Sequence, residues 1–139
     1  MKYAKKMIAL SLVALPILAV AQMTSSTRIV GQVPFSFIVG IKHVAAGECT
    51  VERATDRVLV IRNVAAKVGL FTAATPNQAK NPSKSYALVF RKYGKQAFLT
   101  GIKLAGDRTV YAIPESPAEA ELRAQNQTGT EEILLASAK

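Results

Sequence analysis

The stretch VPFSFIVGIKHVAAGECTV, residues 33–51, decides the fold. Its first half alternates apolar residues along an extended backbone, and the side chains of a strand point to opposite faces in turn. Gly40 and Gly47 bracket a turn region, after which the alternation resumes. The pattern predicts two antiparallel strands that share a core. The expected core residues of this pair are Phe35, Phe37, Cys49 and Val51.

More strands are expected along the rest of the chain. Short apolar runs are separated by turn residues roughly every eight to twelve positions, which is typical of an antiparallel barrel or sandwich. Pro34 cannot donate to a strand ladder, so it predicts an edge or a bulge in the first segment. Residues 73–83, with Pro76 and Pro82, are expected to form an irregular loop. The expected strands are 28–39, 48–53, 57–62, 68–72, 86–93, 96–103, 108–113 and 133–136.

The clearest hairpin joins residues 86–93 to residues 96–103, with Gly94-Lys95 as its turn. Period two places alternate residues of each strand on one face. In the first strand this face carries Tyr86, Leu88 and Phe90, and in the second it carries Phe98, Thr100 and Ile102. Phe90 and Phe98 are expected to be core residues.

The hydrophobic period changes at Ser116-Pro117-Ala118-Glu119, which predicts a helix over 117–125. The Ser116 hydroxyl can accept from the Glu119 amide, while the Glu119 carboxylate returns to the Ser116 amide. Gly129 lies past the expected helix end. The predicted fold is therefore mostly β: a small antiparallel β-barrel or β-sandwich with one short C-terminal helix.

The N-terminus has the three parts of a signal peptide, expected over residues 1–21. Three lysines precede an apolar run of about a dozen residues, which is too short to span a bilayer. Ala19-Val20-Ala21 supplies small residues for cleavage near Ala21, before Gln22. An uncleaved anchor is the alternative. The protein is expected to be exported, and to be periplasmic or extracellular after cleavage.

Removal of these 21 residues, with three lysines, from a 139-residue chain of net charge +9 leaves 118 residues and a charge of +6. That length suits one β-rich domain, residues 22–139, and no segment of it predicts a transmembrane helix. A basic surface favours anionic partners such as cell-wall polymers, lipid head groups or nucleic acid, although moderate charge also serves solubility. The tightest basic group is Arg91-Lys92 with Lys95.

One cysteine and one histidine limit the possible chemistry. A single Cys49 excludes an internal disulfide, and its inward strand position predicts a buried, inert thiol rather than a reactive one. One His and one Cys exclude the usual zinc sites. His43 is expected in an exposed turn, and only a six-residue spacing favours its pairing with Cys49 as nucleophile and base. We expect no catalytic residues, no metal site and no cofactor.

The remaining polar patterns are also weak signals of a site. Glu48 and Glu52 share a strand face with Thr50, which permits a paired-carboxylate site, but a solvent-facing strand explains them better. Aromatic and basic residues interleave over 90–98, as in some nucleic-acid binders, but the aromatics fit the core. No phosphate-binding loop or nucleophile elbow is present. Nucleic-acid binding and enzyme activity are therefore not expected.

Four segments of the mature chain form a recognisable series: VPFSFIVG, AAGECTVER, ALVFRKYGKQAFLTGI and the helix SPAEAEL. Over nearly the whole mature chain, this series resembles a family of small exported bacterial proteins without a characterised activity. These are similar to the family's V-P-F-x-F-x-V-G start, P-A-G-x-Y-x-V strand, L-V-F-x-x-Y-G hairpin and S-x-A-E-x-E-L helix. Ala45 replaces the usual Pro, and Cys49 replaces the usual Tyr. The resemblance implies a compact β domain and no particular reaction.

These observations favour a non-catalytic exported β domain with a binding or structural role in the cell envelope. Its partner would be another envelope protein or an anionic cell-surface polymer. One alternative is a barrel that holds a small apolar ligand, and another is an envelope-surface binder that uses its positive charge. An enzyme whose site the sequence does not reveal is the alternative from a different class.

Overall fold

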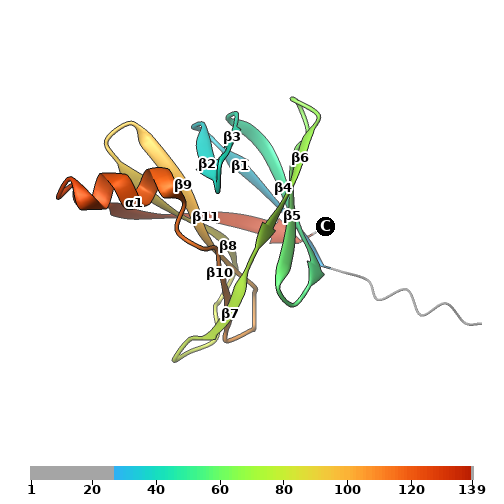
Figure 1. Cartoon of the computed structure of the whole chain (residues 1–139). Helices are drawn as coiled ribbons and strands as arrows, with labels where there is room; N and C mark the ends of the chain where they lie inside the picture. Colours follow the sequence, from blue (N-terminus) through green and yellow to red (C-terminus); the bar gives the residue numbers. More distant parts are fainter. Residues whose placement is uncertain (1–26, 139) are drawn as a thin grey trace, which may run out of the picture.

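The computed structural model describes residues 27–138 (Figure 1). The predicted signal peptide, residues 1–21, lies outside the described residues. The fold is mostly β with one short helix, as predicted. Within 27–138 we find no helix with the length and apolar character needed to cross a membrane. The elements are β1 (Arg28–Val33), β2 (Phe37–Val39), β3 (Lys42–Val44), β4 (Gly47–Thr55), β5 (Val58–Asn63), β6 (Val68–Ala73), β7 (Thr75–Gln78), β8 (Tyr86–Tyr93), β9 (Gln96–Lys103), β10 (Thr109–Ala112), α1 (Pro117–Ala124) and β11 (Thr130–Ala138).

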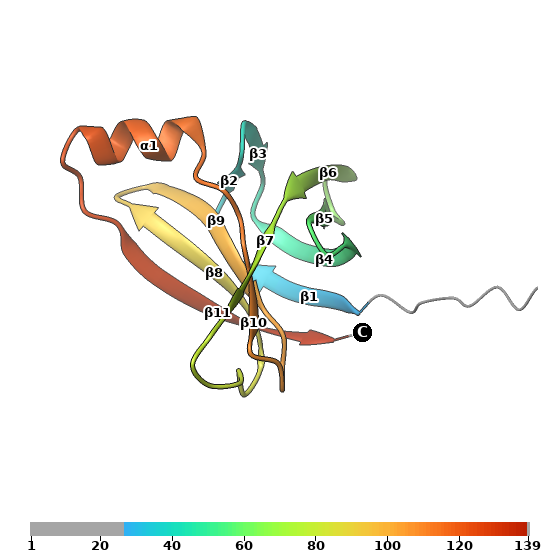
Figure 2. The same ribbon diagram turned by 60° about the horizontal axis from the view of Figure 1, so that its bottom comes forward.

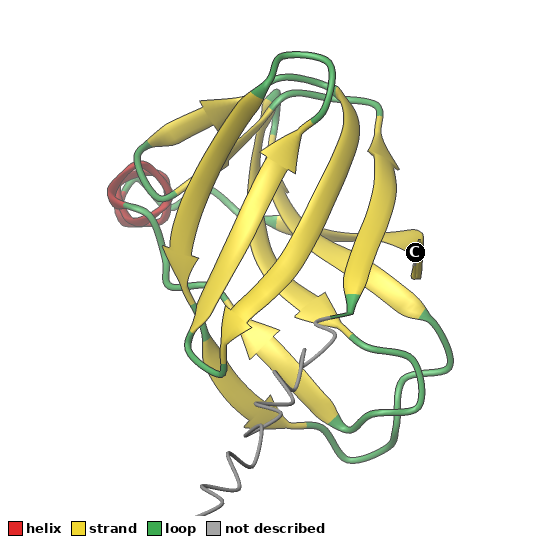
Figure 3. Ribbon diagram, turned by 90° about the vertical axis from the view of Figure 1, so that its right-hand side faces the viewer, coloured by secondary structure: helices red, strands yellow, loops and turns green. Residues whose placement is uncertain are grey.

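The strands form one nearly closed, barrel-like sheet (Figures 2 and 3). Its strand order is β3-β2-β9-β8-β11-β1-β4-β5-β6. Only Ala74 separates β6 from β7, and β7 pairs with β10, which in turn pairs with β9. The path that leaves β9 through β8 is hydrogen-bonded as far as β6, continues along the chain through Ala74 into β7, and returns to β9 through β10. This return favours the barrel over the sandwich.

The prediction of an irregular loop over 73–83 was partly wrong, because a strand forms within it. Residues 75–78 form β7 although they include Pro76. Proline is tolerated there because β7 has a hydrogen-bonded partner on one side only. Irregular backbone is confined to 79–85, where the Ser83 amide donates to the Asp107 carbonyl at 3.0 Å and ties this loop to the β9–β10 turn.

The expected first strand, 28–39, is divided into β1 and β2. β1 runs antiparallel to β4 from Arg28↔Glu52 to Val33↔Gly47, as predicted, whereas β2 pairs with β3 and β9 instead of β4. The break after Val33 occurs at the proline, as expected. The turn region at 40–47 was predicted as a plain connection, and this was wrong because it contains β3. Gly40, at φ +61°, makes the tight turn between β2 and β3. β2 also pairs with β9, and this is the one parallel pair among the described strands.

The β8–β9 hairpin has its predicted bounds, but a bulge changes its faces. Val89 pairs with Gly101 whereas Phe90 pairs with Leu99, so Thr100 is the extra residue. One extra residue reverses the alternation of side chains along a strand. Phe98 and Ile102 therefore belong to different clusters of buried residues, and the prediction that they share a face was wrong.

The main hydrophobic core fills the barrel. Phe37 and Phe90 are fully buried there, and their rings meet edge to face with centroids 5.1 Å apart. Cys49 and Val51 are buried beside them, as predicted. Phe35 is only partly buried and packs against Phe90 from the side, also at 5.1 Å.

Helix α1 lies outside the barrel, against the β8–β9 hairpin (Figure 2). Its predicted N-cap is confirmed, since the Ser116 hydroxyl accepts from the Glu119 amide at 3.1 Å. The other half of the predicted capping box was wrong. The buried Glu119 carboxylate instead accepts from the Tyr93 hydroxyl at 3.0 Å and from the Arg91 guanidinium at 3.2 Å. A second apolar cluster completes the contact, formed by Ile38, Tyr93, Phe98, Ala118 and Leu122.

The helix ends one residue earlier than predicted, at Ala124, and Asn126 forms the turn that ends it. Asn126 has φ +61°, and the amides of Asn126 and Gln127 donate to the carbonyls of Arg123 and Leu122, which is a Schellman motif. Gly129 has a different role, because a Cβ there would lie 2.6 Å from the Arg91 Cγ. The strand that follows, β11, is longer than predicted because it pairs with both β8 and β1.

Candidate functional site

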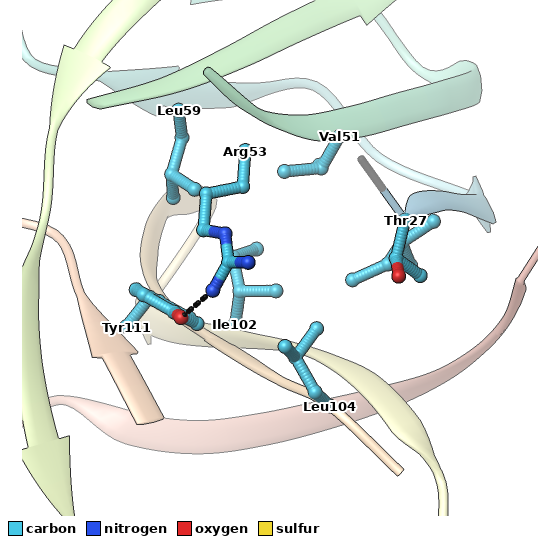
Figure 4. Close-up of a pocket in the computed structure, with 8 residues that line it drawn as sticks. Thr27, Val51, Arg53, Leu59, Ile102, Leu104 and Tyr111 are labelled. Atoms are coloured by element: carbon cyan, nitrogen blue, oxygen red, sulfur yellow. Dashed lines mark hydrogen bonds between the residues drawn. The ribbon is translucent and has the colours of Figure 1, made fainter. Parts of the chain in front are cut away.

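One end of the barrel interior holds a small cavity of about 30 Å³ (Figure 4). Thr27, Arg53 and Tyr111 border it together with apolar side chains. The Arg53 guanidinium donates to the Tyr111 hydroxyl and lies 5.6 Å from the centre of its ring. This volume suits about one water molecule, whereas sites for small organic ligands measure roughly 300–1,000 Å³. The cavity therefore weighs against a ligand-binding barrel.

The two residues with nucleophilic or metal-binding chemistry lie in different environments. Cys49 is buried in the barrel core, as predicted, and burial raises its pKa to about 12. His43 is exposed on β3, a strand that is not a hydrogen-bonded neighbour of β4. A thiol that stays protonated is neither a nucleophile nor a metal ligand. The geometry thus gives no support to a His43–Cys49 pair.

We expect Cys49 to resist alkylation in the folded protein. At about pH 8 a thiolate attacks iodoacetamide and displaces iodide, and both burial and the raised pKa suppress the thiolate form of Cys49. Intact mass spectrometry should show an unmodified native protein and one added group after denaturation in urea. Full labelling under conditions that leave the circular dichroism spectrum unchanged would contradict the buried position.

Across residues 27–138, no three His, Cys, Asp or Glu side chains are grouped so that they could hold an ion. Glu52, which the sequence places on one face with Glu48, contacts two arginines instead. These two arginines also line a groove on the surface of the described chain.

A groove of about 450 Å³ lies on the outer face of the sheet at β4, β5 and β6. Thr50, Arg62 and Gly69 are neighbours across these three strands in the strand register. Arg28 on β1 borders one end of this row, and Lys67 in the β5–β6 turn borders the other. The complete lining is Arg28, Thr50, Arg62, Asn63, Val64, Lys67, Val68 and Gly69.

Glu52 joins the two arginines of the groove. Its carboxylate oxygens lie 2.5 Å from the Arg28 Nε and 2.7 Å from the Arg62 Nη1. Hydrogen bonds from Arg28 in the first place, and from Arg62, hold the pKa of this carboxyl below its ordinary value. The ion pairs therefore persist at neutral pH and are lost as the pH falls through the folded-state pKa. About half of each arginine side chain remains exposed.

The β5–β6 turn is held by a buried amide. The Asn63 side chain donates to the Ala45 carbonyl at 2.7 Å, and its oxygen accepts from the Ala66 amide at 3.0 Å. The next residue, Lys67, has a backbone φ of +54°, which is uncommon for any residue other than glycine. The turn thus holds Lys67 at the end of the groove.

The basic group that stands out in the sequence is not this site. Arg91 is paired with Glu119 at 3.2 Å, and Lys92 with Glu132 at 2.8 Å. The sequence identified no residue of the groove as a functional one. Two features of the sequence do fall at or beside the groove. One is the strand face that Glu52 shares with Thr50, and the other is Arg62, the arginine that ends the run RVLVIR.

No protein-family model matches the chain, and comparisons with curated proteins and with solved structures found no significant match.

Proposed function

We propose that this protein is an exported, non-catalytic binding domain of the cell envelope that holds an anionic polymer in the groove. The observation that carries the proposal is the charge of the groove. Arg28, Arg62 and Lys67 border it, and Glu52 is the one carboxylate that contacts them among the described salt bridges. A surplus of positive charge in a concave surface concentrates anions there.

The arginine pairs support a binding role because they fix the cations in place. A guanidinium binds carboxylate and phosphate groups through two parallel hydrogen bonds, provided that it is correctly oriented. Glu52 orients two guanidiniums and leaves about half of each side chain open to solvent. A ligand would therefore meet donors that have already lost much of their rotational freedom.

The export part of the proposal rests on the signal-peptide pattern of residues 1–21. Envelope polymers with repeated acidic groups are then the abundant anions that the mature protein meets. The interior cavity of about 30 Å³ makes the surface groove a better binding site than the barrel interior.

The double variant Arg62→Gln/Lys67→Asn should bind polygalacturonate about tenfold more weakly than the wild type at low salt. Each exposed ion contact contributes up to about 1 kcal/mol, and 1.4 kcal/mol corresponds to tenfold. Asn replaces Lys67 because it tolerates a positive φ. Fluorescence anisotropy with a labelled polymer measures the affinity, and binding should also weaken as salt rises.

The matched control is Lys80→Gln/Lys84→Gln, which removes the same charge from exposed positions of the 79–85 loop. We expect this control to bind within about twofold of the wild type. Equal losses in both double variants would show that net charge, and not the groove, attracts the polymer. A wild-type protein that fails to bind polygalacturonate and poly(glycerol phosphate) would refute the proposal.

A further inference from the structure

We infer that the polymer is an acidic polysaccharide and that one of its sugar rings stacks on Phe71 beside the basic groove. The inference rests on the proposed function and names the ligand class of the same site. It stands on two residues of β6 that the fold does not require, Phe71 and Gly69.

Phe71 is the first of these residues. It pairs with Val60 on β5 and points outward, with 75% of its surface exposed, while its neighbour Leu70 is buried in the core. A large aromatic ring at such a position contributes little to the core. In the register Phe71 is the diagonal neighbour of Arg62, and such neighbours lie within reach of long side chains. An aromatic face thus stands next to a groove-lining cation.

Gly69 is the second residue, and it lines the groove between Arg62 and Lys67. A glycine inside a strand weakens it, and it often marks a place where a ligand approaches the backbone closely. Neither strain nor crowding calls for glycine at this position. Its φ is not in the left-handed region, and a Cβ would meet only the Arg62 Cγ, at an ordinary contact distance of 3.6 Å. Because Gly69 has no side chain, the groove surface near Phe71 stays open to a ligand.

The modest charge of the groove favours a polysaccharide over a nucleic acid. A nucleic acid carries one phosphate per nucleotide, and its binding sites combine several cations with a series of stacked aromatics. Here Glu52 offsets part of the positive charge, and Phe71 is the one large aromatic among the markedly exposed hydrophobic residues described. A flat sugar ring with one carboxylate matches one aromatic face and one guanidinium.

Two variants test the inference. Phe71→Ala removes the aromatic ring, and Gly69→Thr places a side chain in the groove where the glycine leaves space. Anisotropy titrations with polygalacturonate are run at low salt and at about 0.5 M NaCl, where exposed charges are screened. Both variants should bind roughly five- to tenfold more weakly than the wild type. The loss for Phe71→Ala should persist at high salt, because stacking does not depend on exposed charge. Leu135→Ala, at a residue 73% exposed on β11, is the matched control and should bind like the wild type.

Thermal unfolding separates binding from folding. Threonine is favourable in a strand, so Gly69→Thr should melt at the same or a higher temperature than the wild type while it binds worse. If Arg62→Gln/Lys67→Asn loses affinity but Phe71→Ala and Gly69→Thr do not, the inference fails and the proposed function survives. If the wild type binds no polyanion, both fail. Tighter binding of poly(dT) than of polygalacturonate, lost in Phe71→Ala, would assign the ring to nucleic acid and overturn the polysaccharide.

Discussion

Phe37→Ala should lower the free energy of unfolding by about 3–5 kcal/mol. Phe37 is 1% exposed and contacts Phe90 edge to face inside the barrel. Its truncation removes buried apolar surface, leaves a cavity and breaks an aromatic pair that contributes about 0.5–1.5 kcal/mol beyond its area. Urea denaturation followed by circular dichroism measures the change as a lower transition midpoint at constant slope.

Phe71→Ala is the control for this experiment, because it deletes the same side chain from an exposed position. It should change the free energy of unfolding by no more than about 0.5 kcal/mol. A loss below about 1 kcal/mol for Phe37→Ala would place that ring outside the core. Equal losses for the two variants would mean that the assignment of inner and outer faces is wrong.

The sequence predicted the elements whose signals are local. The β8–β9 hairpin is visible because Gly94-Lys95 separates two apolar runs, and the helix is visible because Ser116 and Pro117 mark its start. The core position of Phe37 follows from period two alone. In each case a few neighbouring residues contain the whole signal.

Elements whose partners are distant in sequence were missed. β7 forms because it pairs with β10, which lies more than thirty residues later in the chain. The pairing runs from Thr75↔Ala112 to Gln78↔Thr109. The face of Phe98 depends on a bulge at Thr100. The adjacent Gly101 is compatible with a bulge, but only the pairing with β8 shows that there is one and which residue is extra. Long-range pairing decides both features, and a local pattern cannot show it.

The groove was missed for the same reason. Arg28, Glu52 and Arg62 belong to three strands and become neighbours only when β1, β4 and β5 pair in register. Conversely, the basic run at 91–95 looked dense in sequence, but two of its cations are neutralised by Glu119 and Glu132 from other elements. Charge along a chain therefore predicts net attraction to anions, while the fold decides where it acts.

Glu119→Ala should lower the free energy of unfolding by about 2–3 kcal/mol, mostly by releasing helix α1 from the barrel. Glu119 is 2% exposed and accepts hydrogen bonds from Tyr93 and Arg91. Burial, reinforced by the hydrogen bond to Glu119, raises the pKa of Tyr93, so its hydroxyl stays a donor at neutral pH. Without the carboxylate this buried donor has no acceptor, whereas Arg91, with 39% of its side chain exposed, can turn to water.

The loss should be local, and this separates it from the effect of Phe37→Ala. Hydrogen exchange in Glu119→Ala should speed up for the amides of residues 120–125, while the amides of β8 and β9 keep their protection. Glu119→Gln is the matched variant, since its side-chain oxygen can still accept from Tyr93, and it should cost only about 1 kcal/mol. Faster exchange throughout the barrel in Glu119→Ala would mean that the carboxylate supports the whole sheet. Unchanged exchange in the helix would mean that Ile38, Phe98 and Leu122 hold α1 without it.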